Sequence, residues 1–408
     1  LTITKMKKLM TFALCFAAIG SMSAQKANVE AAKKLSGKPE KISEARSLIQ
    51  QAMENPETAN DAQTYFIAGK IEFDAFDKDL TNSMINPASV DNLKMGENLI
   101  NGYNAYMKAL PLAATPNEKG KVDTKTPKAI VNTLKGHAND YFKAGADFFN
   151  GQKVYPEAYE SFMIYADMPT QNFMQGEKFE LPDADRGTAY FNAGLAAYSG
   201  NEYLKSADAF RKARGVGYDD KQAYIYEIAC WQMLAQRDST MEQTAKDKIM
   251  EVAEAGDAKY GMEEPLFVNN IVNFLVTDGK NDEAVAKVTS LLAANPDNAG
   301  LYGLRGFVYD RMGKDTESVD DYRKAASIDG VDYETLKNAV KKVYRVGADK
   351  WQAIEGNSEA DRAARLEVKT DYFEAAKAMA NKAKGMNSND GDLDYLIESI
   401  DYALSLAN

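Results

Sequence analysis

The sequence predicts an all-α protein, a superhelical solenoid of stacked helix–turn–helix units. Two observations predict this fold: no segment shows the apolar–polar alternation of a half-buried strand, and two stretches of the chain resemble each other. Residues 189–215 and 301–330 each carry an aromatic residue, a glycine four positions later, and a turn. Each then carries a second aromatic residue, followed three positions later by alanine. Because one such unit cannot bury its apolar face alone, stacked neighbours must stabilise the array.

The spacing predicts a packing role for these positions. Small residues let two helices approach closely, and aromatic residues fill the remaining gaps. The pattern resembles the tetratricopeptide repeat, a helix–turn–helix unit of about 34 residues. The resemblance assigns repeat packing to Tyr190, Gly194, Phe210 and Ala213 in the first stretch, with Ser206 at another small position, and to Tyr302, Gly306, Tyr309, Tyr322 and Ala325 in the second, with Ser318 at that small position.

Residues 61–330 are expected to contain about six irregular copies of the unit. The third and fourth copies match the pattern less regularly than the first two, and the third has one extra residue in its turn. A fifth copy is interrupted by an apparent insertion at residues 75–95, and the sixth pairs residues 223–236 with 244–256. The matching residues are Tyr141, Gly145, Phe148, Ala158, Phe162 and Tyr165 in the third copy, Phe267, Phe274, Ala284, Leu291 and Pro296 in the fourth, and Tyr65, Gly69, Phe73, Tyr106 and Ala109 in the fifth.

The segments on either side of the array predict caps. Residues 25–60 are expected to form an N-terminal helical cap or degenerate repeat, and residues 331–408 a degenerate repeat followed by C-terminal capping helices. Residues 114–127 and 168–186 contain prolines and many polar residues, which predicts two long loops. Long loops on a solenoid tend to lie on one face and often take part in binding.

Residues 1–24 have the composition of a secretory signal peptide. Three lysines precede an apolar run from Leu9 to Ile19, and small residues lead to a predicted cleavage after Ala24. We therefore expect an exported protein that is periplasmic or associated with the outer membrane. Since Leu14 rather than a small residue precedes Cys15, we expect no lipid anchor at that cysteine. No internal run reaches the roughly 20 apolar residues of a membrane span, so none is predicted.

Composition argues against several functional classes. The formal charge of −11 and the absence of basic runs argue against nucleic-acid binding. A single histidine, His137, argues against histidine-rich metal centres and most catalytic triads. We therefore expect no catalytic residue, metal or cofactor.

Cys230 lies in an apolar helical stretch and is expected to be buried. Ser239 is a candidate O-glycosylation acceptor, because Asp-Ser-Thr at 238–240 resembles the modified sequence of exported Bacteroidota proteins.

The resemblance also implies a binding face. Tetratricopeptide proteins usually bind peptides or proteins in a groove lined by the first helix of each hairpin. On this chain that face would carry the aromatic residues Phe66, Phe73, Phe142, Phe149, Phe191 and Tyr198. Whether these rings line an open groove or belong to the core stays open.

The function expected from the sequence is a non-catalytic scaffold that binds protein or peptide partners in cell-envelope assembly or transport. Two alternatives remain. One is an outer-membrane glycan-binding protein of the starch-utilisation type, which would use tryptophan platforms, although the chain has only Trp231 and Trp351. The other is an all-helical hydrolase.

Overall fold

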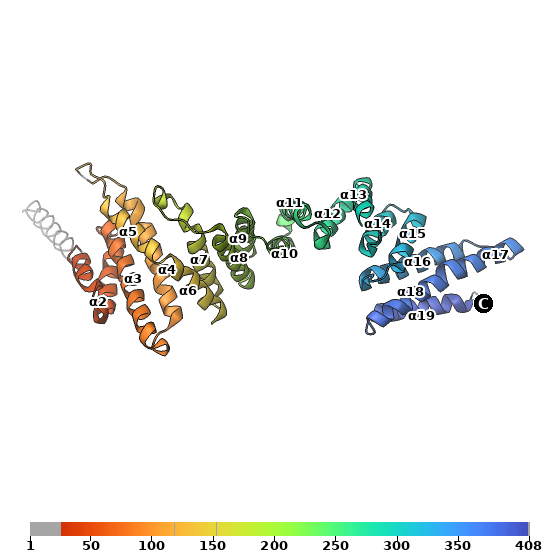
Figure 1. The fold of residues 1–408 in the computed structure, drawn as a ribbon, viewed down its shortest axis with the longest axis horizontal. Helices are drawn as coiled ribbons and strands as arrows, with labels where there is room; N and C mark the ends of the chain where they lie inside the picture. The colour runs from red at the N-terminus through yellow and green to blue at the C-terminus, as the bar shows by residue number, and fades with distance from the viewer. Residues whose placement is uncertain (1–25, 118, 152, 407–408) are drawn as a thin grey trace, which may run out of the picture. The chain divides into compact units, whose positions relative to one another are not determined.

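A computed structural model describes residues 26–117, 119–151 and 153–406 of the chain (Figure 1). The predicted signal peptide at residues 1–24 lies outside these residues. Every regular element in the described part of the chain is a helix, which confirms the all-α prediction. None of these helices combines the length and the apolar character needed to span a bilayer.

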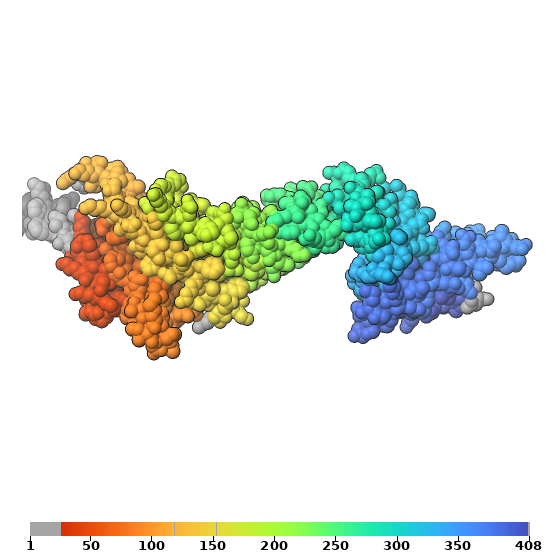
Figure 2. Space-filling view, in the orientation of Figure 1, coloured from red at the N-terminus to blue at the C-terminus, as the bar shows by residue number. Residues whose placement is uncertain are grey.

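The chain divides into two compact units, Leu1–Ala245 (unit 1) and Lys246–Asn408 (unit 2). The division falls inside helix α11 (Glu242–Tyr260), within the repeat array expected at residues 61–330. Within each unit, side chains fill the spaces that the ribbon leaves between neighbouring helices (Figure 2).

Unit 1 is a series of helices in which each packs mainly on its neighbours along the chain. Residues 26–36 are helical, and α3 packs on α4, α6 on α7, α7 on α8, and α8 on α9 (Figure 1). The further helices are α2 (Ile42–Glu54), α3 (Ala62–Ile85), α4 (Asn92–Ala113), α5 (Lys125–Gly136), α6 (Ala138–Asn150), α7 (Tyr155–Asp167), α8 (Asp183–Ser199), α9 (Tyr203–Gly215) and α10 (Gln222–Arg237).

Unit 2 continues the pairwise packing and ends in longer helices. Helix α12 packs on α13, α13 on α14, α14 on α15, and α16 on both α15 and α18. Helices α17 and α18 join through a π-helical turn, so residues 359–386 form one interrupted helix. The elements are α12 (Pro265–Thr277), α13 (Asn281–Ala294), α14 (Ala299–Arg311), α15 (Asp315–Ser327), α16 (Tyr333–Gln352), α17 (Glu359–Val368), the turn Lys369–Glu374, α18 (Ala375–Met386) and α19 (Gly391–Leu406).

The close approach predicted inside each hairpin is present. A Cβ built on the first-helix glycine would lie within 3.3 Å of an aromatic ring of the second helix in three hairpins. At Gly145 and Gly194 a methyl group would overlap the ring, and at Gly306 it would make a tight contact. The distances are 2.8 Å for Gly145 and Phe162, 2.6 Å for Gly194 and Phe210, and 3.2 Å for Gly306 and Tyr322.

The small residue of the second helix also makes the same contact in two hairpins. The buried Ser206 hydroxyl donates a hydrogen bond to the carbonyl oxygen of Gly194 at 2.8 Å. In α15 the buried Ser318 hydroxyl donates to the carbonyl oxygen of Gly306, also at 2.8 Å. Serine at this position therefore ties the second helix to the point of closest approach on the first. These equivalent contacts show that the hairpin unit predicted from the sequence recurs in units 1 and 2.

The turns inside the hairpins share one geometry. Asn201, Gly279 and Gly313 have φ angles of 62°, 74° and 69°, the left-handed conformation of a helix C-terminus. In each case the next residue's backbone N–H bonds to the carbonyl oxygen five residues earlier, as in a Schellman motif. The third predicted copy has one more residue between the bonded groups, since Val154 N–H bonds to Phe148 C=O. This is the extra turn residue expected from the sequence.

Replacing Gly194 with alanine is expected to destabilise unit 1. The new Cβ would overlap the Phe210 ring, and overpacking costs about 1–3 kcal/mol, offset by up to about 1 kcal/mol from improved helix propensity. Gly215→Ala at the end of α9 is the matched control, because nothing lies within 4 Å of its Cβ position. Urea unfolding should show a lower midpoint for Gly194→Ala only. Equal midpoints in the two variants would contradict the close contact.

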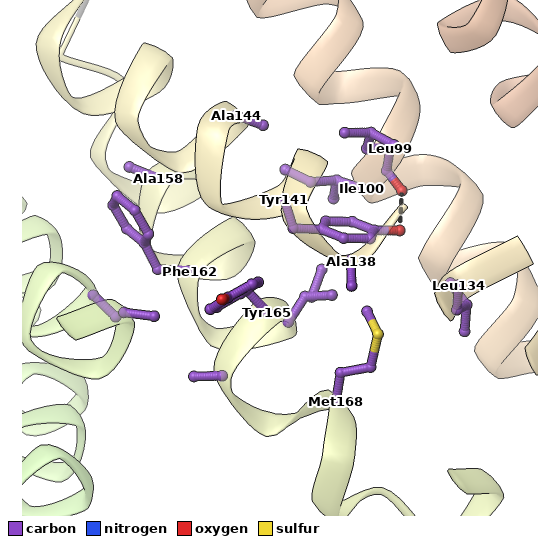
Figure 3. Packing of buried hydrophobic residues seen from close by; sticks show 14 of the residues in the cluster. Leu99, Ile100, Leu134, Ala138, Tyr141, Ala144, Ala158, Phe162, Tyr165 and Met168 are labelled. Carbon is purple, nitrogen blue, oxygen red and sulfur yellow. Dashed lines mark hydrogen bonds between the residues drawn. The ribbon is translucent and has the colours of Figure 1, made fainter. Parts of the chain in front are cut away.

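The core of unit 1 is built from these positions. Tyr141 is fully buried, and its hydroxyl donates a hydrogen bond to the carbonyl oxygen of Leu99 at 3.2 Å (Figure 3). Phe162 and Tyr165 of α7 and Met168 lie in the same cluster. The core therefore runs continuously from α4 through α7, as expected when neighbouring hairpins share their apolar faces.

The residues expected as an insertion at 75–95 are mostly helical: they lengthen α3 to Ile85 and begin α4 at Asn92. Two other sequence expectations need correction. The loop expected at residues 114–127 ends earlier, because α5 begins at Lys125. Pro296 does not pack in a helix interface; it is exposed in the turn after α13. A proline there cannot continue the helix, so its role is termination.

Candidate binding surfaces

The six aromatic residues predicted for the groove of unit 1 do not share one environment. Five are half-buried and line the first helices α3, α6 and α8: Phe66, Phe142, Phe149, Phe191 and Tyr198. Each of these rings contacts another aromatic ring of the protein. The sequence left open whether these rings line an open groove or belong to the core. In the structure these five rings do both, because they contribute to packing and also keep part of their surface exposed.

Phe73 departs from the prediction. It is 3 % exposed, and its ring stacks on those of Tyr106 and His137, each with centroids 5.1 Å apart. A Cβ on Gly102 of α4 would lie 2.8 Å from the Phe73 ring. Phe73 thus fills the space between α3 and α4 as a core residue and offers almost no surface to a partner.

The aromatic residues of α8 belong to a cluster that spans three helices. Phe191 stacks on Tyr218 at 4.9 Å and contacts Phe210 edge-on at 5.4 Å. Tyr226 of α10 stacks on Phe210 at 5.5 Å and contacts Tyr198 at 5.6 Å. Aromatic pairs of this geometry stabilise a structure beyond their area burial. Phe191 and Tyr198 are therefore held in fixed orientations at the surface of unit 1.

A hollow of about 390 Å³ lies beside Phe66 in unit 1. His137 lines it, at the N-cap of α6, with Nδ1 3.0 Å from Asp140 Oδ2 and Nε2 3.7 Å from Asp77 Oδ1. Burial raises the pKa of Asp77, and the nearby histidine opposes that rise. Lys70 pairs with Asp74 at 2.7 Å on the same wall. The hollow thus combines aromatic rings with charged groups of both signs.

A larger groove of about 780 Å³ lies in unit 2, and the sequence did not single it out. Its walls come from the first helices α12, α14 and α16 and from the turns that precede α14 and α16. Apolar side chains and asparagine amides line its helical walls, and carboxylates lie on the two turns and at the start of α16. The residues that matter for its chemistry are Val268, Asn269, Asn273, Asp297, Leu301, Leu304, Phe307, Asp329, Asp332, Glu334 and Asn338.

The cysteine, the two tryptophans and the candidate glycosylation site singled out from the sequence lie outside these two hollows. Cys230 is buried as predicted, burial raises its pKa to about 12, and its thiol lies 3.1 Å from the Ser206 hydroxyl. Trp231 is 9 % exposed, and Trp351 packs at 5.8 Å from Phe373. Ser239 is exposed in a short 3₁₀ turn, and its modification stays a prediction. Among the described residues no group of three or more His, Cys, Asp or Glu could hold a metal ion.

The groove of unit 2 escaped the sequence analysis for an identifiable reason. Three of its four acids lie in the turns "NPDN" (295–298) and "DGVD" (329–332), which join one hairpin to the next, and Glu334 follows in the first turn of α16. Both turns fall at the same place in the repeat, so their carboxylates line the same groove from successive hairpins of unit 2. The equivalent position of the two acidic turns could have indicated a shared acidic surface. Because turns are ordinarily polar, the sequence analysis did not single them out.

Comparison with known proteins found no matching family model and no matching curated protein. Solved structures that align with the chain include a TPR repeats protein from Bacteroides fragilis NCTC 9343, at 16% identity over 67% of this chain and 98% of that one, with a TM-score of 0.32. Yeast Tom70 aligns at 11% identity over 93% of this chain and 96% of that one, with a TM-score of 0.26. At these TM-scores the likeness carries no functional information, and the repeat assignment rests on the glycine, serine and turn contacts described above.

Proposed function

We propose that this chain, an array of tetratricopeptide-type helix hairpins, is an exported, non-catalytic scaffold that binds protein partners on the faces formed by its first helices. The observation that carries the proposal is the state of the aromatic residues on α6 and α8. Phe142, Phe149, Phe191 and Tyr198 keep exposed surface while neighbouring rings hold them in place. Rigid, half-exposed aromatic side chains are the type of anchor that dominates binding energy at protein interfaces.

The proposed location rests on residues 1–24. A basic start, an apolar run and a small-residue cleavage zone are the three parts of a secretory signal. A periplasmic or outer-membrane-associated scaffold would act in assembly or transport complexes of the cell envelope. The glycan-binding alternative is less favoured, because Trp231 is buried and Trp351 packs against Phe373, so neither forms an open platform.

Site-resolved photo-crosslinking tests this proposal. A benzoylphenylalanine residue placed at Phe142 or at Phe191 should crosslink the full chain to protein partners in the cell envelope of the source organism. The control position is Leu204, which is 59 % exposed on α9. We expect discrete crosslinked species from positions 142 and 191 and none from position 204. Identical products from all three positions, or none from any, would refute binding at the first-helix face.

A further inference from the structure

We propose that the groove of unit 2 binds an extended, basic segment of a partner protein. This inference rests on the proposed scaffold function and adds a second surface to it, together with the chemistry of the segment that the surface accepts. The groove is formed wholly within unit 2, between α12, α14 and α16. Its volume of about 780 Å³ accommodates several residues of an extended chain.

The charged residues that line the groove are all acidic. Asp297, Asp329, Asp332 and Glu334 line it, whereas none of its lining residues is a lysine, arginine or histidine. All four acids are exposed. One oxygen of Asp332 accepts the backbone N–H of Thr335 and caps α16. The carboxylates thus present a negative surface to whatever enters the groove, and electrostatic complementarity requires a cationic ligand.

Several acids of unit 2 that are buried or half-buried have an intramolecular counter-ion. Asp310 pairs with Lys342, Asp321 with Arg305, and Asp390 with Lys337, each within 2.7 Å. By contrast, within the described part of the chain no cation lies within ion-pair distance of Asp297, Asp329 or Glu334. Asp297, Asp329 and Glu334 thus line the groove as exposed carboxylates without a counter-ion among the described residues. A partner's lysine or arginine side chains would complete the missing pairs.

Asparagine side chains supply the complementary polar groups. Asn269 and Asn273 lie one turn apart on α12, and Asn338 belongs to α16; all three are exposed and line the groove. A primary amide both donates and accepts hydrogen bonds, which matches the N–H and C=O groups of an extended backbone. Such contacts bind main chain regardless of sequence, while the carboxylates select for positive side chains.

The floor of the groove is apolar. Val268 and Leu301 are buried at its base, and Leu304 and Phe307 are half-buried beside them. A peptide with apolar side chains between its basic ones would therefore satisfy the floor and the rim together. The same arrangement argues against a nucleic acid, whose phosphates the carboxylates would repel.

Fluorescence anisotropy tests the proposal directly. The probe is a fluorescein-labelled octapeptide in which lysine and leucine alternate, and the comparison peptide carries glutamate at each lysine position. We expect the lysine peptide to bind the full chain at low salt, to bind more weakly as salt rises, and the glutamate peptide not to bind. Failure of the lysine peptide to bind, or equal binding of both peptides, would overturn the proposal.

Two triple variants separate specific from general attraction. Asp297→Asn, Asp329→Asn and Glu334→Gln together should weaken binding about tenfold or more, because three charge pairs are lost. The control variant removes the same number of charges from exposed acids of unit 2 outside the groove, Asp320→Asn, Glu367→Gln and Glu398→Gln, and should change affinity less than about twofold. Equal weakening in the two variants would mean that the peptide responds to net charge and not to the groove.

An uncharged variant provides an independent check. Asn269→Ala with Asn273→Ala leaves the net charge unchanged and should still weaken binding, because the backbone amide contacts are removed. Unchanged affinity would exclude these amides from the site. The crosslinks from Phe142 and Phe191 in unit 1 do not depend on this groove. If they form while the lysine peptide fails to bind, the scaffold function stands and the basic-segment proposal falls; if both fail, neither stands.

Discussion

Replacing Phe210 with alanine is expected to lower the free energy of unfolding of unit 1 by about 3–5 kcal/mol. Phe210 is fully buried, and it fills the space opposite Gly194 at the closest approach of α8 and α9. Its ring also stacks on Tyr226 of the next hairpin and contacts Phe191. Truncation would therefore leave a cavity inside one hairpin and loosen its contact with the next, and rigid neighbouring helices cannot close such a cavity fully.

Urea unfolding followed by tryptophan fluorescence measures this loss. In a Trp351→Phe background, Trp231 of α10 is the one tryptophan left and reports on unit 1. Leu204→Ala is the matched control, because Leu204 lies on the same helix but is 59 % exposed, so its truncation should change stability by no more than about 0.5 kcal/mol. Similar losses in both variants would show that α9 does not present Phe210 to α8 as described.

Replacing Glu227 with alanine is expected to cost about 3–5 kcal/mol, because it breaks a buried ion pair from one side. Glu227 of α10 is 2 % exposed and accepts a hydrogen bond from Arg214 Nε of α9 at 2.7 Å. Only 13 % of the Arg214 side chain is exposed. Loss of the carboxylate would leave that guanidinium buried without its counter-ion, and a desolvated, uncompensated charge is strongly destabilising.

Two companion variants test the cause of that loss. Glu202→Ala removes an acid paired with Lys205 at 3.4 Å, where both side chains are more than half exposed, and should cost no more than about 1 kcal/mol. The double variant Arg214→Met with Glu227→Met removes both buried charges and should recover most of the stability lost in the single variant. A double variant no more stable than Glu227→Ala would attribute the loss to packing and not to the unpaired charge.

The repeat packing could be predicted from the sequence because it depends on contacts close in the chain. Gly194 and Ser206 are 12 residues apart, as are Gly306 and Ser318, and in both hairpins the same hydrogen bond joins them. Helix periodicity and turn length fix which side chains meet over such short separations. The extra residue in the turn before α7 was predictable for the same reason.

The exposure of individual rings could not be predicted in this way. Phe66 and Phe73 occupy related faces of α3, yet Phe66 is half-buried and Phe73 is almost completely buried. The Tyr106 ring on α4 stacks on both phenylalanines, but Phe73 is covered in addition by the ring of His137 and lies against Gly102 of α4. His137 lies between α5 and α6, more than 60 residues from Phe73 in the sequence. Burial at such positions depends on helices that the local pattern does not place.

The sequence by itself determined the helical class, the hairpin pairing, the small-and-aromatic contacts within each hairpin and the burial of Cys230. These features follow from periodicity and side-chain volume, which act over one or two helices. Only the tertiary structure decided that the array divides into two units, that Phe73 belongs to the core, and that acids from two turns and from the start of α16 line one groove with the asparagines of α12 and α16. The physical reason is that surfaces of a repeat protein arise where successive hairpins stack, and the contacts that position one hairpin on the next join residues of different repeats.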